Sequence, residues 1–226
     1  MTGLDPVGLG ALVVWGAIVG LDLASWPQLM LSRPLVAGSI AGLLVGDIAA
    51  GLAVGGVLEL FALDVLPIGA TQYPDFGVAA LTGVVLAAGR PVPAMLGMAT
   101  GLALVIAILS GPLIERVRRA NARAASGAAA ALAEGNAHVV SALHLGGLRR
   151  DLIRSIVLSL VAVVAGLALR PLGLPPGRLA LPLLLVAVAG ALAAAIRGAV
   201  RSSSQGGRFA WVAAGFAAGV LVLLWR

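Results

Sequence analysis

Residues 22–76 read DLASWPQLMLSRPLVAGSIAGLLVGDIAAGLAVGGVLELFALDVLPIGATQYPDF, an apolar stretch that nevertheless contains five carboxylates. A carboxylate at the centre of a bilayer costs about 3 kcal/mol on insertion scales, so such groups usually face a cavity, a partner or a substrate path. The frequent glycines and prolines point the same way, because irregular backbone at membrane depth is tolerated only when it is buried in protein or lines a cavity. The stretch therefore predicts a site for a small polar solute, as in a transporter.

The composition of the whole chain predicts an integral membrane protein. The 226 residues are 61% hydrophobic and only 11% charged, whereas soluble domains are about 25% charged. At about 20 residues per span, we expect an all-α polytopic protein with roughly seven to nine spanning, broken or re-entrant helices. Residues 1–24 have neither a basic start nor an Ala-x-Ala cleavage site, so we expect a first membrane helix and not a signal peptide. The absence of cysteine excludes disulfides and thiolate metal sites.

The charges are divided along the chain. Residues 1–110 hold six acids and two arginines, whereas residues 111–226 hold three acids and thirteen arginines. The residues from Glu115 to Arg154 are the most basic part and surround an alanine-rich run that favours helix. By the positive-inside rule this part is cytoplasmic. Its arginine clusters, at 116–123 and 149–154, have two interpretations: topology with contact to anionic lipid, or docking of a phosphorylated partner.

The pattern of prolines and glycines predicts where the helices break. Residues 7–21 form a first helix, and Pro27 and Pro34 break the chain between Ser25 and Pro34. Residues 35–58 are hydrophobic and carry a glycine stripe at four-residue spacing, which lets another helix approach closely. The stripe consists of Gly38, Gly42, Gly46, Gly51 and Gly55. Residues 59–74 are too short and too polar for a simple span, and Pro67-Ile68-Gly69 is read as a break or a re-entrant tip.

The remaining apolar segments complete a division into three regions. Residues 78–88 have about half the length of a crossing, and further helices are expected at 94–111, 155–169, 179–196 and 209–225. We therefore expect an N-terminal membrane region 1–111 containing the substrate-site segment 22–76, a cytoplasmic basic segment 112–154, and C-terminal membrane helices 155–226.

Two stretches resemble the IIC subunit of mannose-family phosphotransferase system (PTS) permeases. The first runs through Arg33-Pro34-Leu35, Leu44-Val45-Gly46-Asp47, Gly55-Gly56-x-x-Glu59, Ile68-Gly69-Ala70 and Pro74-Asp75. The second runs from Glu134-Gly135-Asn136 to Ser141-x-x-His144. The resemblance covers roughly residues 10–160; beyond it the chain is hydrophobic with few polar landmarks.

This resemblance implies group translocation of a hexose or amino sugar across the bacterial inner membrane. In the family, IIC and a IID subunit form the sugar path, a phosphorylated IIB subunit transfers its phosphoryl group to the sugar, and IIA recharges IIB. Family members assemble as trimers of IIC–IID pairs. The IIC chain is not phosphorylated, so the resemblance implies no catalytic residue and no cofactor in this chain.

Sugar hydroxyls both donate and accept hydrogen bonds, so carboxylate, amide and hydroxyl side chains are the candidates for contact with the sugar. Two lie at the first break and five in the broken segment that follows the glycine stripe. They are Asp22, Gln28, Glu59, Asp64, Thr71, Gln72 and Asp75. Each has an alternative role as a helix cap or as a partner of Arg33 or Arg90.

Other polar residues are read as structural. Asp47 follows Gly46 of the glycine stripe and is expected to be a cap or an ion-pair member, and Arg33 is expected to pair with an acid. His138 and His144 are six residues apart, which is not the spacing of two metal ligands on one helix face, so we expect no metal site. The chain has no lysine, which argues against a P-loop ATPase.

Two other functions stay open from the sequence. A diverged facilitator or ion-coupled carrier would move its solute without phosphorylation and use the acids as proton or cation sites. A membrane scaffold that does not transport would keep the IIC fold, but its candidate site would bind no substrate.

Overall fold

The computed structural model describes residues 4–65 and 73–202, and this part of the chain is all-helical. Its elements are α1 (Pro6–Ala24), α2 (Pro34–Leu44), α3 (Ile48–Ala62), α4 (Phe76–Ala87), α5 (Val92–Gly127), α6 (Ala129–Ala133), α7 (Ala137–Leu169), the 3-10 helix η1 (Arg170–Leu172) and α8 (Gly177–Ser202). Four helices (α1, α5, α7 continued by η1, and α8) are long and apolar enough to cross a membrane, whereas α2, α3 and α4 are shorter apolar helices. This agrees with the predicted polytopic membrane protein with broken helices.

The hydrophobic segment expected at 35–58 is two helices rather than one. Gly46, with a φ of 74°, turns the chain between α2 and α3, and Asp47 caps α3 by accepting from the backbone N–H of Ala50 at 3.0 Å. The same carboxylate accepts from the Gly89 N–H at 2.8 Å, which ties the turn to the end of α4. The structural role expected for Asp47 is therefore confirmed.

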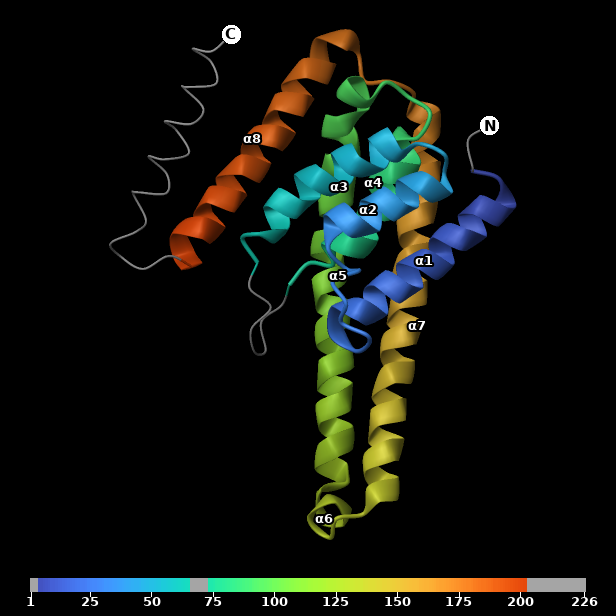
Figure 1. Cartoon of the computed structure of the whole chain (residues 1–226), viewed down its shortest axis with the longest axis vertical. Coiled ribbons are helices and arrows are strands. Elements are labelled where there is room, and N and C mark those ends of the chain that lie inside the picture. Colours follow the sequence, from blue (N-terminus) through green and yellow to red (C-terminus); the bar gives the residue numbers. More distant parts are fainter. Residues whose placement is uncertain (1–3, 66–72, 203–226) are drawn as a thin grey trace.

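The glycine stripe lets α2 and α3 pack as a close antiparallel pair (Figure 1). A Cβ atom added to Gly51 would lie 2.4 Å from the carbonyl oxygen of Gly38, and one added to Gly42 would lie 2.9 Å from the Cα of Gly51. The predicted close approach of two helices is confirmed. The two helices are α2 and α3 themselves, which carry the first and the second half of the glycine stripe.

Helix α4 is the centre of the molecule. All of its residues are buried, and it contacts α1, α2, α3, α5 and α7. Arg170 donates to the carbonyl oxygens of Val85 and Ala88 at its C-terminal end. Because other helices cover every side of α4, this apolar helix can be buried in the protein although it is too short to cross the membrane.

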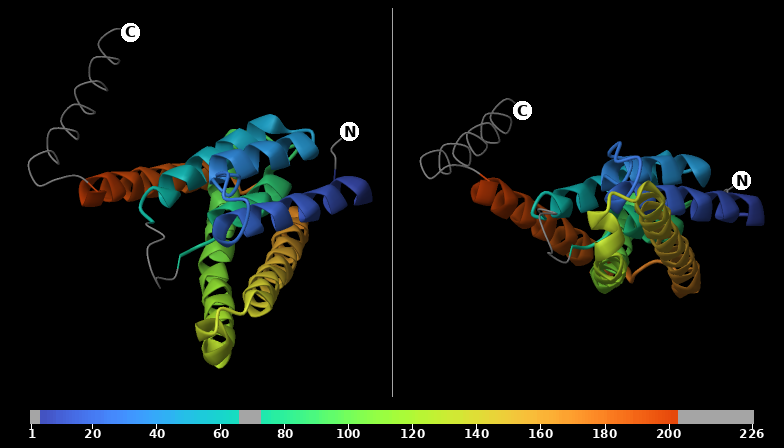
Figure 2. Two further views of the ribbon diagram at one scale, coloured as in Figure 1. Left: turned by 60° about the horizontal axis from the view of Figure 1, so that its bottom comes forward. Right: turned by 90° about the horizontal axis from the view of Figure 1, so that it is seen from below.

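Helices α5 and α7, joined by α6, form a hairpin that projects beyond the short helices (Figures 1 and 2). The sequence prediction ended a helix at residue 111, but α5 continues through Pro112 to Gly127. Gly135, with a φ of 73°, and the cap Asn136 start α7 at the hairpin tip. The arginines at positions 116, 118, 119, 123, 149 and 150 lie on this hairpin.

Helix α8 runs back from the far end of α7 and packs on α5 and α3 (Figure 1). Only 11% of its most apolar stretch is buried, the smallest share among the four long helices. Its predicted extent, 179–196, lies within the observed helix. The span predicted at 209–225 lies outside the described residues.

Candidate functional site

The topology brings the ends of four helices together: the C-terminal ends of α1 and α3, and the N-terminal ends of α2 and α4. Asp22 lies in the last turn of α1, Glu59 in the last turn of α3, and Asp75 is the N-cap of α4. Two neighbouring cavities lie among these ends and share Val65, Pro74 and Phe76 in their walls. The residues that the sequence placed in one segment are therefore also neighbours in space.

Asp22 organises the break between α1 and α2. Its buried carboxylate accepts from the backbone N–H groups of Leu29 and Ser32, the latter at 2.8 Å. Gln28 is exposed and has a φ of 58°. The contacts of Asp22 are thus those of a loop cap, and contact of Asp22 or Gln28 with a sugar stays a prediction.

Glu59 pairs with Arg33, as expected for that arginine. Nε of Arg33 donates to Glu59 Oε1 at 2.6 Å, and the backbone N–H of Leu35 donates to Oε2 at 3.1 Å. The side chains are 20% (Glu59) and 40% (Arg33) exposed. Arg33 lines the smaller cavity, of about 190 Å³, and its ion pair holds Glu59, which is not part of that lining, next to the cavity wall.

Tyr73, a residue of this smaller cavity, was not singled out from the sequence. Tyr73 forms part of its wall and is buried. The guanidinium of Arg118 lies 4.7 Å from the centre of its ring and donates to its hydroxyl oxygen at 2.9 Å. The weak signal in the sequence was that this is the chain's single tyrosine, but nothing in the sequence related it to Arg118.

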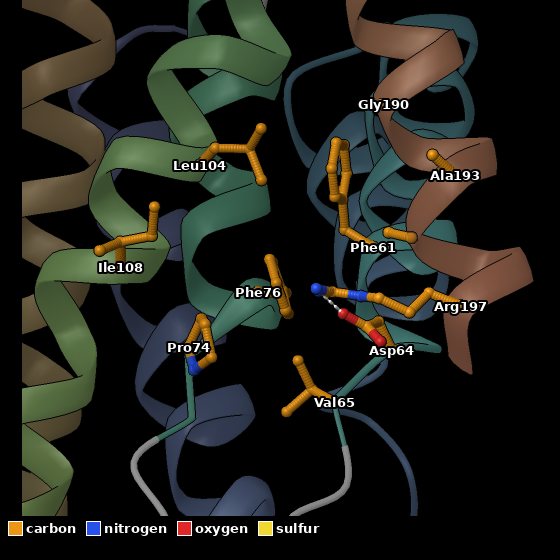
Figure 3. A pocket seen from close by; sticks show the side chains of 11 residues that line it. Phe61, Asp64, Val65, Pro74, Phe76, Leu104, Ile108, Gly190, Ala193 and Arg197 are labelled. Carbon is orange, nitrogen blue, oxygen red and sulfur yellow. Dashed lines mark hydrogen bonds and ion pairs between the residues drawn. The ribbon is translucent and has the colours of Figure 1, made fainter. Parts of the chain in front are cut away.

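Asp64 lies in the wall of the larger cavity, of about 540 Å³, between α8, α5 and the ends of α3 and α4 (Figure 3). Its carboxylate pairs with Arg197 and, at 2.9 Å, with Arg201, both from α8. The other walls are mainly apolar, formed by Phe61, Val65, Pro74, Phe76, Leu104, Ile108, Gly190, Ala193 and Ala194.

Asp75 belongs to a buried charge network. Arg154 donates to Asp75 at 3.1 Å and to Asp151 at 2.7 Å, and all three side chains are at most 3% exposed. Arg154 also donates to the Gly20 carbonyl oxygen at 2.7 Å, and Ser25 Oγ donates to Asp151. The interpretation of the 149–154 cluster as lipid contact or docking is therefore wrong for Arg154, because this guanidinium is enclosed by protein.

Three remaining predictions concern residues outside this geometry. Thr71 and Gln72 lie outside the described residues. His138 and His144 are exposed on the hairpin, and the described part of the chain contains no group of three His, Asp or Glu side chains that would hold a metal ion. Arg90, expected as a possible partner of an acid, instead donates to the carbonyl oxygens of Arg170 and Gly173.

The family model of the sorbose-specific IIC component of the PTS matches residues 9–170. The chain belongs to this family. It is a multi-pass membrane protein of the group that the two sequence stretches resemble.

Individual relatives match over shorter stretches. The sorbose-specific EIIC component of Lacticaseibacillus casei is 35% identical over 83 residues, which are 37% of this chain and 30% of the relative. The mannose-specific EIIC component of Escherichia coli K12 is 30% identical over 137 residues, 60% of this chain and 49% of the relative. The chain thus spans half or less of the length of these relatives.

Solved structures share the fold over nearly the whole chain. One, described only as a membrane protein, has a TM-score of 0.70 at 21% identity and covers 98% of this chain and 96% of its own. Another, from a complex of the mannose transporter ManYZ with microcin E492, has a TM-score of 0.58 at 20% identity, with coverage of 100% and 96%. At these identities the likeness concerns the fold alone.

Proposed function

We propose that this chain is the sugar-translocating IIC subunit of a mannose-type, phosphoenolpyruvate-dependent PTS in the bacterial inner membrane. It binds and passes a hexose or amino sugar that a IIB partner phosphorylates. The observation that carries the proposal is the Arg33–Glu59 pair beside a cavity at the break between short helices, in a chain of the IIC family. Broken helices that meet at a polar site follow the general logic of transporters.

The smaller cavity is the proposed sugar site. Sugar hydroxyls both donate and accept, so a guanidinium and a carboxylate side by side can serve the two halves of one hydroxyl. Tyr73 adds an aromatic wall, which is typical of sites that combine apolar surface with a few polar groups. Asp64 lies in the adjoining cavity, and Asp22 and Asp75 position the loop and α4 around both. Direct contact is therefore proposed for Glu59, which is paired with the cavity residue Arg33.

The proposed partners follow the family. A IID membrane subunit completes the path, and phosphorylated IIB, which IIA recharges, transfers its phosphoryl group to the sugar on the cytoplasmic side; the assembly is a trimer of IIC–IID pairs. The basic hairpin, with Arg116, Arg119, Arg123 and Arg149 among its residues, supports this proposal because clustered cations attract a phosphorylated protein. We accordingly propose that residues 112–154, which include the basic hairpin, lie in the cytoplasm.

The direct test is sugar binding by the chain purified with its IID partner in nanodiscs. Glu59→Gln leaves the shape of the side chain but removes the charge that holds Arg33, so affinity for a transported hexose is expected to fall at least about tenfold, or ~1.4 kcal/mol. Glu134→Gln, an equivalent change on the exposed hairpin tip, is the matched control and leaves affinity unchanged. Equal affinities of wild type and Glu59→Gln would remove Glu59 from the site.

A further inference from the structure

The larger cavity has chemistry that does not suit a sugar. Helix α8 forms one wall with Gly190, Ala193 and Ala194, whose small side chains leave a hollow along the helix, and α5 forms the opposite wall with Leu104 and Ile108 (Figure 3). At about 540 Å³ it falls within the usual range of small-molecule sites, about 300–1,000 Å³. Apart from Asp64 and Arg197, its side chains offer no hydrogen-bonding group for a hydroxyl.

One end of this cavity carries excess positive charge. Arg197 and Arg201 share the single carboxylate of Asp64, and their side chains are 69% and 50% exposed. A guanidinium has five N–H donors. Their hydrogen bonds to Asp64 use one donor of Arg197 and two of Arg201. Within residues 4–65 and 73–202, donors on both arginines thus remain for an acceptor that approaches from outside the helix.

The sequence supplies no further carboxylate side chain nearby along the chain. Residues 152–226 contain no aspartate or glutamate, and neither do residues 66–72. Helix α8 is long and apolar enough to cross a membrane, and most of its apolar stretch faces outward. The arginines lie in its last turns, where long basic side chains reach the membrane interface. The exposed arginines beside an apolar hollow at the membrane interface therefore favour an anionic membrane component as the ligand.

We propose that an anionic phospholipid occupies this cavity, with an acyl chain along Gly190, Ala193 and Ala194 and its phosphate on Arg197 and Arg201. A free phosphate would use the arginines but not the apolar hollow, and a neutral lipid would use the hollow but not the charge. The lipid would fix α8 against α3 and α5 at the side of the cavity that adjoins the proposed sugar site. The inference goes beyond the proposed function and does not depend on it.

Two pairs of variants separate the hollow from the charge. Ala193→Trp fills the hollow and leaves both arginines, whereas Val186→Trp places the same bulk at a position of α8 that is 72% exposed and not part of the cavity. Arg197→Gln removes one cation but leaves Asp64 paired with Arg201, whereas Arg178→Gln removes an exposed arginine at the opposite end of α8.

The measurement is native mass spectrometry of the purified chain with added phosphatidylglycerol or phosphatidylcholine of the same acyl chains. Wild type is expected to retain phosphatidylglycerol several-fold more than phosphatidylcholine. Ala193→Trp strongly lowers retention of phosphatidylglycerol because it fills the hollow, and Arg197→Gln reduces this retention about fivefold, which corresponds to ~1 kcal/mol for one basic residue near anionic lipid. Val186→Trp and Arg178→Gln retain the lipid as wild type does.

Three results would overturn the proposal. Equal retention of the two lipids by wild type would show that the arginines do not recognise the lipid phosphate. Equal effects of Ala193→Trp and Val186→Trp on lipid retention would show that the lipid does not occupy this cavity. Protection of wild type against thermal unfolding by water-soluble glycerol phosphate, to the same extent as by phosphatidylglycerol, would make the arginines a free-anion site.

Discussion

Arg154 on α7 donates to Asp75, the N-cap of α4, at 3.1 Å, although 79 residues separate them in the chain. Asp75 also receives structural support from α5, because its backbone N–H donates to Ser110 Oγ at 2.7 Å. Since α7 is one arm of the basic hairpin, this ion pair links the hairpin directly to the N-terminal end of α4, which lies beside both cavities. The hairpin and the candidate site are therefore parts of one connected structure.

Replacing Arg154 by glutamine is expected to destabilise the protein strongly. Removing one member of a buried ion pair leaves an uncompensated charge and typically costs about 3–5 kcal/mol, and here two buried carboxylates, Asp75 and Asp151, would lose their partner. Thermal unfolding in detergent measures the effect. Arg119→Gln, at a 71% exposed side chain, is the control and should cost less than about 1 kcal/mol. Similar losses for both variants would contradict the structural role of the network.

The close pairing of α2 and α3 predicts opposite effects at two glycines of one helix. Gly51→Ala places a Cβ atom 2.4 Å from the Gly38 carbonyl oxygen, so the helices must separate at a cost of about 1–3 kcal/mol. Gly56→Ala meets no atom within 4 Å and raises helix propensity by up to about 1 kcal/mol. Thermal unfolding of the two variants should move in opposite directions, and a stabilising Gly51→Ala would show that the pair is looser than described.

Tyr73 should contribute to sugar affinity mainly through its ring. Tyr73→Phe removes the hydrogen bond from Arg118 but keeps the aromatic wall of the smaller cavity, whereas Tyr73→Ala removes both. We expect Tyr73→Ala to weaken binding about tenfold, ~1.4 kcal/mol, and Tyr73→Phe to weaken it less. Titration of a transported hexose into the purified IIC–IID complex measures this order, and a larger loss in Tyr73→Phe would assign the role to the hydroxyl.

The cytoplasmic position of the hairpin can be tested by labelling, since the chain has no cysteine of its own. Ala133→Cys lies at the hairpin tip and Leu174→Cys lies beyond the other end of α7, and both positions are exposed (Figure 1). A membrane-impermeant maleimide applied to intact spheroplasts should label only Leu174→Cys, and Ala133→Cys should react after permeabilisation. The reverse pattern would invert the proposed topology.

Much of the helical layout was predictable because its signals are local. The prolines at 27 and 34 end one helix and begin another, and the Arg90-Pro91 break precedes α5. The division of residues 35–58 was missed because hydropathy is uniform there. Gly46-Asp47 carried the signal, since a glycine with positive φ followed by an aspartate cap is a helix-to-helix turn.

The gathering of the acidic residues could be predicted from the sequence, but their contacts could not. The acids gather where the sequence placed them, and the Arg33–Glu59 pair follows from a basic residue at a helix start near an acid. The partners of Asp64 and Asp75 come from α8 and α7, more than 75 residues away in the chain. Such pairs depend on how the helices pack, so a single sequence contains no pattern that identifies them.

The measurement that tests the account most directly is uptake of labelled hexoses and amino sugars by cells that express this chain with its neighbouring PTS genes, with chemical identification of the internal product. We predict sugar phosphate inside the cell, with uptake strongly reduced in Glu59→Gln and unchanged in Glu134→Gln. Free sugar inside the cell, or uptake that follows the proton gradient instead of phosphoenolpyruvate, would contradict group translocation.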